Sequence, residues 1–295
     1  MHKLTPKTEA ALTLDDEGRV EFLQSKKWVN YTAAQRALDL LHALLKHPTV
    51  HRMPNMLLVS ETNNGKTAVI RHFRDMVTPV EDPNAEVTIT PVILVQAPPV
   101  PDERRLLSLI LDCLNAPYKR NDRADNLSRT LKTLAPQVGV RMLIIDEIHH
   151  LLAGETRRQD AFRNVIKTLG NELEISIVAA GTKEAFNAIR VDEQLSNRFR
   201  PFALPRWEYN LNYRRFLVSY EQFLPLRKRS DLSEERLSQK IFGMAGGTVG
   251  EIADLLRSAS VEAINSREEK ISPQLLDRLE WVRDVDRTEA QMKKL

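Results

Sequence analysis

The sequence predicts an α/β fold: a three-layer core in which helices cover both faces of a parallel sheet, followed by a small helical domain. Three observations predict it. Short runs of consecutive apolar residues recur along the first two thirds of the chain, as strands buried on both faces require. Helical patterns separate these runs, which is typical of parallel sheets. After Trp207 the pattern is only helical.

The first part of the core can be assigned element by element. Residues 1–31 are mixed and charged, and we interpret them as an extended arm that is available to a partner. Thr32 and Gln35 form a capping-box pair before an amphipathic helix that stops at Pro48. Next come a strand at 56–59, a helix at 66–77, a β-rich stretch at 87–95 and helices at about 102–114 and 125–135.

The remaining elements complete the core and add the helical domain. A strand at 142–146, a helix at about 158–173, a strand at 175–182, a helix at 183–189 and the stretch 201–205 end a core that spans 32–206. Helices at about 210–223, 233–245, 248–265 and 272–282 form the helical domain over 207–282, and 283–295 is a C-terminal tail. Thr248 with Glu251, and Ser272 with Pro273, mark two helix starts.

The segment from Ser60 to Thr67 reads SETNNGKT and joins a predicted strand to a predicted helix. This is the layout of a phosphate-binding loop, in which backbone N–H groups and a helix N-terminus point at phosphates. We expect Lys66 to reach the β- and γ-phosphates and the Thr67 hydroxyl to ligate Mg²⁺. Ser60 stands where the usual pattern has glycine. The predicted nucleotide-binding residues are Ser60, Glu61, Thr62, Asn63, Asn64, Gly65, Lys66, Thr67 and Ala68.

Two acids, Asp146 and Glu147, follow the apolar run at 142–145. Because ligands bind at the carboxyl ends of parallel strands, we expect Asp146 to hold Mg²⁺ through a water. Glu147 would orient and deprotonate the attacking water. A solvated strand end is the alternative, and the upstream loop disfavours it. His149 and His150 lack the His-Glu-x-x-His spacing of a metal site, so we expect them to start a helix or to face a neighbour.

Two further residues suit an assembled ATPase. Thr182 ends a predicted strand, where its hydroxyl could lie near the γ-phosphate; it also suits a helix N-cap, and the two roles are compatible. Arg198 precedes the last core stretch, on a surface away from its own pocket. It suits an arginine finger that acts on a neighbouring subunit's γ-phosphate. The sequence does not separate Arg198 from Arg200, and we favour Arg198.

Composition excludes some classes of protein. The chain has 295 residues, of which 42% are hydrophobic and 28% charged, as is ordinary for soluble proteins. Cys113 is the only cysteine, which excludes a disulfide framework and agrees with a reducing compartment. No long apolar run or signal-peptide core is present, so we expect a cytoplasmic protein without a membrane partner. A formal charge of +3 permits nucleic-acid binding by a local patch without requiring it.

Several motifs together resemble an AAA+ ATPase: the loop at 60–67, the segment 143–151, the strand end at 180–182 and the Ser-Asn-Arg-Phe box at 196–199. More narrowly, Arg52-Met53-Pro54-Asn55 leading into Thr62-Asn63-Asn64-Gly65-Lys66-Thr67 is similar to the TniB/TnsC family of transposition ATPases. The resemblance covers about residues 28–280. It departs at Ser60 and in the turn at 246–250, which has no arginine where many AAA+ lids carry a second sensor.

The resemblance implies a regulator of transposition. Such proteins bind ATP and Mg²⁺ at subunit interfaces, assemble as rings or filaments on duplex DNA, and pass a target to a DDE-type transposase, with a target-selection protein as a further partner. The loop with Lys119, Arg120 and Arg123 would then project towards the central channel and contact DNA phosphates. A solvated basic loop is the alternative.

Two other functions fit parts of the pattern. A replication initiator or helicase loader would need a separate DNA-reading domain, and the helices after residue 207 are too few for both a lid and such a domain. A nucleotide-gated scaffold that does not hydrolyse ATP would not need Glu147. ATP turnover measured with and without duplex DNA would distinguish an ATPase from such a scaffold.

Overall fold

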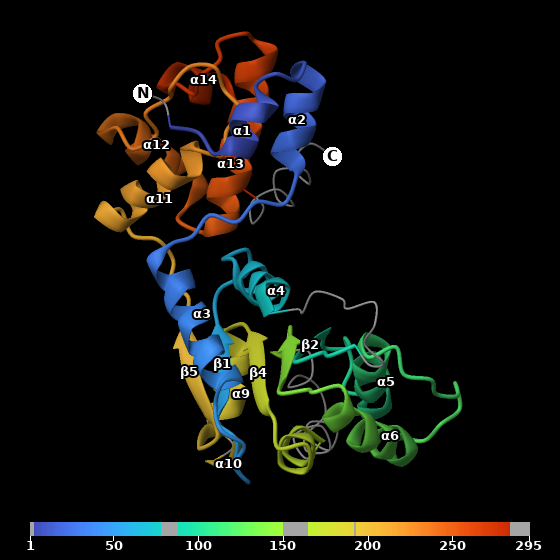
Figure 1. Ribbon diagram of the computed structural model, residues 1–295. Helices are drawn as coiled ribbons and strands as arrows, with labels where there is room; N and C mark the ends of the chain where they lie inside the picture. Colours follow the sequence, from blue (N-terminus) through green and yellow to red (C-terminus); the bar gives the residue numbers. More distant parts are fainter. Residues whose placement is uncertain (1–2, 78–87, 150–164, 192, 284–295) are drawn as a thin grey trace, which may run out of the picture. The chain divides into compact units, whose positions relative to one another are not determined.

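The computed structural model describes residues 3–77, 88–149, 165–191 and 193–283 (Figure 1). His150 and the first part of the helix expected at about 158–173 lie outside these ranges, and residues 165–172 are helical. The chain divides into two compact units. One contains residues 33–62 and 66–205, and the other contains residues 1–32, 63–65 and 206–295.

The first unit is built on a five-stranded sheet in which all strand pairs are parallel. Its strands lie in the order β2-β3-β4-β1-β5, and Figure 1 labels β5, β1, β4 and β2 across the sheet. They are β1 (Asn55–Val59), β2 (Val92–Gln96), β3 (Met142–Asp146), β4 (Ser176–Gly181) and β5 (Phe199–Ala203). The predicted fold class, a parallel α/β core followed by a helical region, is confirmed.

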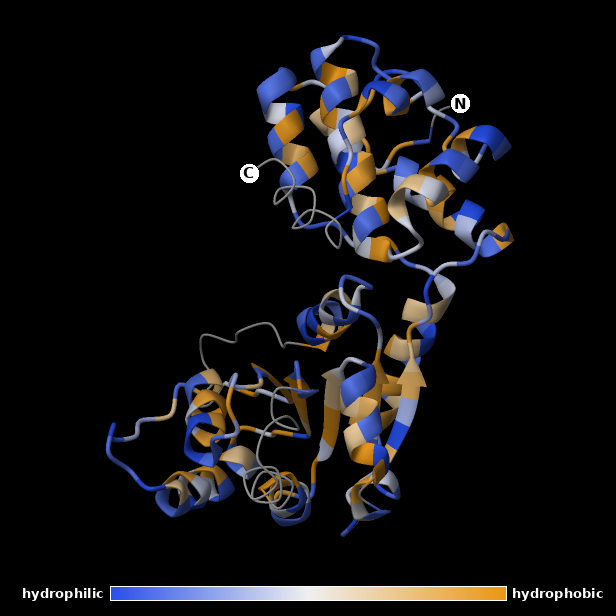
Figure 2. Cartoon of the chain, turned by 180° about the vertical axis from the view of Figure 1, so that it is seen from behind, coloured by the Kyte–Doolittle hydropathy of each residue, from blue (hydrophilic) through white to orange (hydrophobic). Residues whose placement is uncertain are grey.

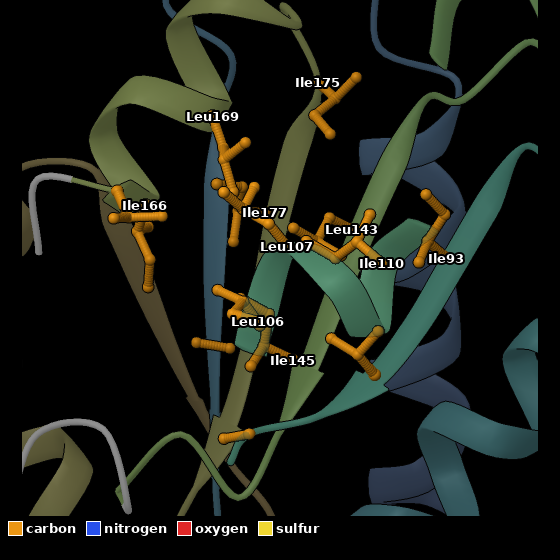
Figure 3. Close-up of a cluster of buried hydrophobic side chains, with 14 of the residues drawn as sticks. Ile93, Leu106, Leu107, Ile110, Leu143, Ile145, Ile166, Leu169, Ile175 and Ile177 are labelled. Atoms are coloured by element: carbon orange, nitrogen blue, oxygen red, sulfur yellow. The ribbon is translucent and has the colours of Figure 1, made fainter. Parts of the chain in front are cut away.

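Helices flank this sheet because the strands carry apolar side chains at alternate positions, on both faces, that have to be covered. Leu143 and Ile145 belong to a cluster with Leu106, Leu107 and Ile110 of one flanking helix (Figure 3). Met142 and Ile144, which alternation turns to the opposite face, are 0% exposed as well. The inner strands β1, β3 and β4 are therefore buried on both faces, whereas the edge strand β5 is mostly exposed. Figure 2 shows much of the sheet in the hydrophobic colour. The flanking helices are α3 (Thr32–Leu45), α4 (Lys66–Val77), α5 (Glu103–Cys113), α6 (Ala124–Gln137), α9 (Lys183–Val191) and the short α10 (Glu193–Ser196).

The second unit is helical and has its own core, centred on leucine and isoleucine side chains of α11 to α14. Two of its helix starts follow the predicted capping signals: Thr248 accepts the N–H of Glu251, and Ser272 accepts the N–H of Leu275. Its helices are α1 (Pro6–Ala11), α2 (Asp16–Gln24), α11 (Leu211–Glu221), α12 (Glu235–Ala245), α13 (Val249–Asn265) and α14 (Pro273–Arg278).

The interpretation of residues 1–31 as an extended arm was wrong. Thr5 and Asp15 cap α1 and α2, which belong to the helical unit. Arg19 of α2 is 0% exposed, and its guanidinium lies 2.7 Å from the Glu269 carboxylate. This hydrogen bond from Arg19 lowers the pKa of the Glu269 carboxyl below its ordinary value. A buried ion pair between positions 250 residues apart ties this segment to the unit.

The described helices do not include a membrane span: over these ranges, none is both long enough and apolar enough to cross a bilayer.

Candidate functional site

The strand order brings three motif-bearing strand ends to one edge of the sheet. β4 lies between β1 and β3, and all three run in the same direction. Val59 is in register with Gly181, and Asp146 is the last residue of β3. The residues that follow these strands therefore meet at the carboxyl edge, where parallel sheets bind ligands.

Thr67 and Asp146 are in direct contact at this edge. The Thr67 hydroxyl, in the first turn of α4, donates a hydrogen bond of 2.7 Å to Asp146 Oδ2. Asp146 itself is 6% exposed. A hydroxyl oxygen and a carboxylate oxygen are the kinds of ligand that Mg²⁺ prefers. The two residues predicted as metal ligands therefore lie together, and their chemistry fits a magnesium ion.

Lys66 and Glu147 complete the charged groups at this edge. The Lys66 side chain is largely buried, and its Nζ atom lies 3.9 Å from Glu147 Oε1. Glu147 has a φ of +55°, an uncommon backbone conformation for a residue with a side chain. Its N–H donates to Asp146 Oδ1 at 2.9 Å. The two neighbouring acids therefore point to different partners: Asp146 contacts Thr67, and Glu147 contacts Lys66.

Ser60 continues the strand into the loop without needing a glycine's conformational freedom. Its N–H donates to the Gly181 carbonyl at 3.2 Å, and its hydroxyl donates to the Glu61 carbonyl at 2.9 Å. Its φ is not positive, whereas those of Asn63 and Gly65 are, at +57° and +84°. A side chain is therefore tolerated at position 60, and the left-handed turns that favour glycine or asparagine come later in the loop.

The tip of the loop, Asn63–Gly65, belongs to the helical unit. The Asn64 side chain accepts a hydrogen bond of 3.2 Å from the N–H of Val249, and Asn64 is 1% exposed. The carbonyl of Asn63 accepts one of 2.9 Å from the N–H of Gly250. Two of the free N–H groups at the start of α13 are thereby satisfied. Of the other predicted nucleotide-binding residues, Glu61, Thr62 and Ala68 are exposed.

Thr182 follows β4 directly, at the same edge of the sheet. Its carbonyl accepts the N–H of Phe186 at 3.3 Å, as expected at the start of α9. Gly181, immediately before it, is packed so closely that a Cβ atom there would lie 2.8 Å from Ile148 Cγ2. Glycine at 181 therefore lets the turn after Asp146 pack against the end of β4, a role that sequence reasoning missed.

The two candidate finger arginines differ in their surroundings. The Arg198 guanidinium donates a hydrogen bond of 2.9 Å to Asn171 Oδ1 and is half-buried. Arg200 is exposed on β5, which lies at the edge of the sheet. Among the interactions of the described residues, a hydrogen bond to a neighbouring side chain orients Arg198, and none is seen for Arg200. Asn171 had no recognisable signal in the sequence.

The basic loop between α5 and α6 exposes Lys119, Arg120 and Arg123. Its backbone is braced by Arg104 of α5, whose guanidinium donates to the carbonyls of Asp122, at 2.8 Å, and of Arg120. Over the described parts of the chain, the three exposed cations form no ion pair of their own. Sequence reasoning missed Arg104, because the two loop carbonyls that it contacts lie 16 and 18 residues further along the chain.

An open pocket of about 650 Å³ lies beside this loop. Its lining includes Arg104, Arg105, Asp112, Tyr118 and Arg120. The Tyr118 phenol donates to Asp112 at 2.8 Å, and this hydrogen bond raises the pKa of the phenol. The wall of the pocket is therefore partly ordered by interactions between its own side chains.

One protein family matches the chain. The family model described as "Bacterial TniB protein" matches residues 19–209. No protein with a curated description is significantly similar in sequence.

Several solved structures share the fold at low sequence identity. Aeropyrum pernix ORC1 in complex with DNA has a TM-score of 0.63 and 17% identity, and the alignment covers 92% of this chain and 69% of that chain. Aeropyrum pernix ORC2, solved as ADPNP–ADP complexes, has a TM-score of 0.62 and 14% identity, and the alignment covers 87% of this chain and 69% of that chain. A variant of Thermotoga maritima RuvB has a TM-score of 0.56 and 15% identity, and the alignment covers 92% of this chain and 79% of that chain. These proteins have AAA+ folds, and the likeness establishes the fold of this chain.

Proposed function

The chain belongs to the TniB family and has an AAA+ fold, and from this premise we propose that it is an ATP-hydrolysing, DNA-binding regulator of transposition. Family membership makes it a transposition-associated AAA+ ATPase. The proposal adds that it assembles as a ring or filament on duplex DNA and recruits or activates a DDE-type transposase, with a target-selection protein as a further partner. Such an activity needs DNA and ATP together and so belongs in the cytoplasm.

The contact between Thr67 and Asp146 is the observation that carries the ATPase proposal. It joins the loop at 60–67 to the end of β3, 79 residues apart in the chain, in a geometry that suits a magnesium ion. When bound, the ion would neutralise charge on the β- and γ-phosphates. Lys66 would pair with the same phosphates, Thr182 would lie near the γ-phosphate, and Glu147 would accept a proton from the attacking water. ORC2 was solved with nucleotides, which supports the choice of ATP.

We expect Lys66→Ala to abolish detectable ATP binding, because it removes the cation that pairs with the phosphates. The measurement is equilibrium titration of a fluorescent ATP analogue. Lys132→Ala is the matched control, because Lys132 pairs with Glu172 at 2.7 Å on the surface, and its loss should leave affinity unchanged. Since Lys66 is buried, a melting curve must show that the variant is folded. ATP binding by folded Lys66→Ala equal to that of the unaltered protein would refute the role.

DNA binding by the loop with Lys119, Arg120 and Arg123 is supported by its exposed charge and by the Arg104 brace. A second basic run, Arg227-Lys228-Arg229, offers less free charge, because Arg227 lies 3.6 Å from Glu269 and Arg229 lies 2.6 Å from Asp231. Contacts to backbone phosphates carry no base specificity, which suits a protein that accepts many targets. The ORC1 structure in complex with DNA shows that a protein of this fold can bind DNA.

We expect Lys119→Ala with Arg120→Ala to weaken duplex binding about equally on unrelated sequences. The slope of log affinity against log salt should become shallower by roughly 0.9 for each DNA phosphate that the variant no longer neutralises. ATP binding by the free subunit should persist. Arg227→Ala with Lys228→Ala removes the same charge elsewhere and is the matched control. If the control variant loses affinity and salt dependence while the loop variant does not, the DNA surface lies on the helical unit.

Assembly on DNA is tested most directly by electron microscopy of the protein with ATP and duplex DNA. A ring or filament that requires both ligands would support the proposal. ATP turnover measured in the same samples separates an ATPase from a scaffold that only binds nucleotide. Particles that remain single subunits under all these conditions would contradict the assembly, whatever the turnover.

A further inference from the structure

The carboxylate of Glu147 lies between two nitrogen groups from different elements. Oε1 lies 3.9 Å from Lys66 Nζ, and Oε2 lies 3.2 Å from Nε2 of His149. The Glu147 and His149 side chains are 26% and 23% exposed. The contact to His149 is the shorter of the two, and both side chains are shielded from much of the solvent, which strengthens an electrostatic interaction between them.

ATP binding is expected to change the contact between Lys66 and Glu147. Lys66 is expected to turn to the β- and γ-phosphates, so its ammonium group is no longer available to Glu147. His149 contacts the other carboxylate oxygen, Oε2, from the turn that follows β3. A carboxylate accepts hydrogen bonds, so a hydrogen on Nε2 of His149 would let the histidine hold Glu147 through this contact.

The backbone of the turn holds His149 in place. The N–H of Ile148 donates to the Ala180 carbonyl at 2.9 Å, which ties the turn to β4. At Gly181 the absence of a Cβ lets Ile148 approach, and the His149 backbone nitrogen lies 3.7 Å from where that Cβ would be. His149 therefore lies on a turn that is packed against the end of β4.

We propose that His149 is a positioning residue for the catalytic base: its ring nitrogen Nε2 holds the Glu147 carboxylate in its orientation once Lys66 has moved to the phosphates. This inference rests on the proposed ATP hydrolysis and extends it. His149 does not contact the reacting atoms. It acts on the rate of the chemical step through Glu147 and does not contribute to nucleotide affinity.

The test compares turnover at saturating ATP with ATP affinity. His149→Ala should lower kcat on the order of 10- to 100-fold, the loss typical of a misplaced catalytic group. The dissociation constant of a non-hydrolysable ATP analogue should stay within about twofold, because the phosphate-binding groups are untouched. A purely structural role would move both quantities, and a shared loss would overturn the inference.

Two conservative variants sharpen the test. Glutamine can place an amide N–H near the position of Nε2, whereas asparagine is one carbon shorter and cannot reach it. His149→Gln should therefore recover most of the turnover, and His149→Asn should resemble His149→Ala. If the alanine variant does not fold, this comparison alone decides. Equal turnover of the glutamine and asparagine variants would overturn the inference.

Glu184 supplies the matched control. The Thr182 hydroxyl and then the Glu184 backbone lower the pKa of the Glu184 carboxyl, with a smaller contribution from the His149 ring. It is thus a second acid near His149, but it is exposed, and Glu184→Gln should leave turnover within about twofold. If the unaltered protein hydrolyses ATP and His149→Ala is equally active, only this inference fails. If the unaltered protein shows no turnover with or without duplex DNA, the proposed ATPase fails with it.

Discussion

Replacing Glu147 by glutamine is expected to remove ATP hydrolysis and to leave ATP binding intact. The amide keeps the shape of the side chain but cannot accept a proton from the attacking water. Loss of a general base typically lowers the rate about 10²- to 10⁴-fold. Binding should persist because Lys66, Thr67 and Asp146 are unchanged. Assemblies on DNA should therefore form with ATP and last longer than those of the unaltered protein.

The measurements are phosphate release and the lifetime of protein on duplex DNA after dilution. Glu172→Gln is the matched control, since Glu172 pairs with Lys132 on the surface, away from the candidate site. Its turnover should equal that of the unaltered protein. Unchanged turnover in Glu147→Gln would remove this residue as the base, and the scaffold alternative would gain support if the unaltered protein were also inactive.

Replacing Arg198 by alanine is expected to lower hydrolysis about 10³-fold or more, the usual cost of losing an arginine finger. ATP-dependent assembly should also weaken, while the affinity of the single subunit for ATP stays the same. Arg198 is chosen because its guanidinium is directed by Asn171, at 2.9 Å. Asn171→Ala should act in the same direction with a smaller effect, because the arginine remains but is less well oriented.

Mixing two inactive variants tests whether Arg198 acts on a neighbouring subunit. Arg198→Ala keeps an intact ATP site, and Lys66→Ala keeps an intact arginine. If the arginine acts across an interface, the mixture should recover part of the turnover that neither variant has alone. Arg200→Ala is the comparison. If it is inactive while Arg198→Ala behaves like the unaltered protein, the finger lies two residues further along the chain.

The sequence alone was sufficient for features that depend on neighbouring residues. The predicted helix at 66–77 matches α4, and the predicted strand at 142–146 matches β3. Apolar periodicity and capping residues act within a few turns, so their pattern can be read locally. The same holds for the spacing of Gly65, Lys66 and Thr67, which places a charged and a hydroxyl side chain at a helix start.

Local patterns misled where a charged segment folds onto a distant one. Residues 1–31 have no continuous apolar stripe, which favoured an extended arm, yet Arg19 is buried against Glu269. Thr5 before Pro6 was a readable helix start, and it shows that the capping signal deserved more weight than the mixed composition. The partner of Arg19 could not be read, because nothing near either residue specifies the other.

What the sequence by itself determined is the set of parts: the strands, the phosphate-binding loop, and the acids Asp146 and Glu147. Only the tertiary structure decided that β4 lies between β1 and β3, that His149 contacts Glu147, and that Asn171 holds Arg198. The physical reason is range. Helix and strand patterns follow from interactions between near neighbours, whereas the order of strands and the contacts of a side chain follow from how the whole chain packs its apolar surface.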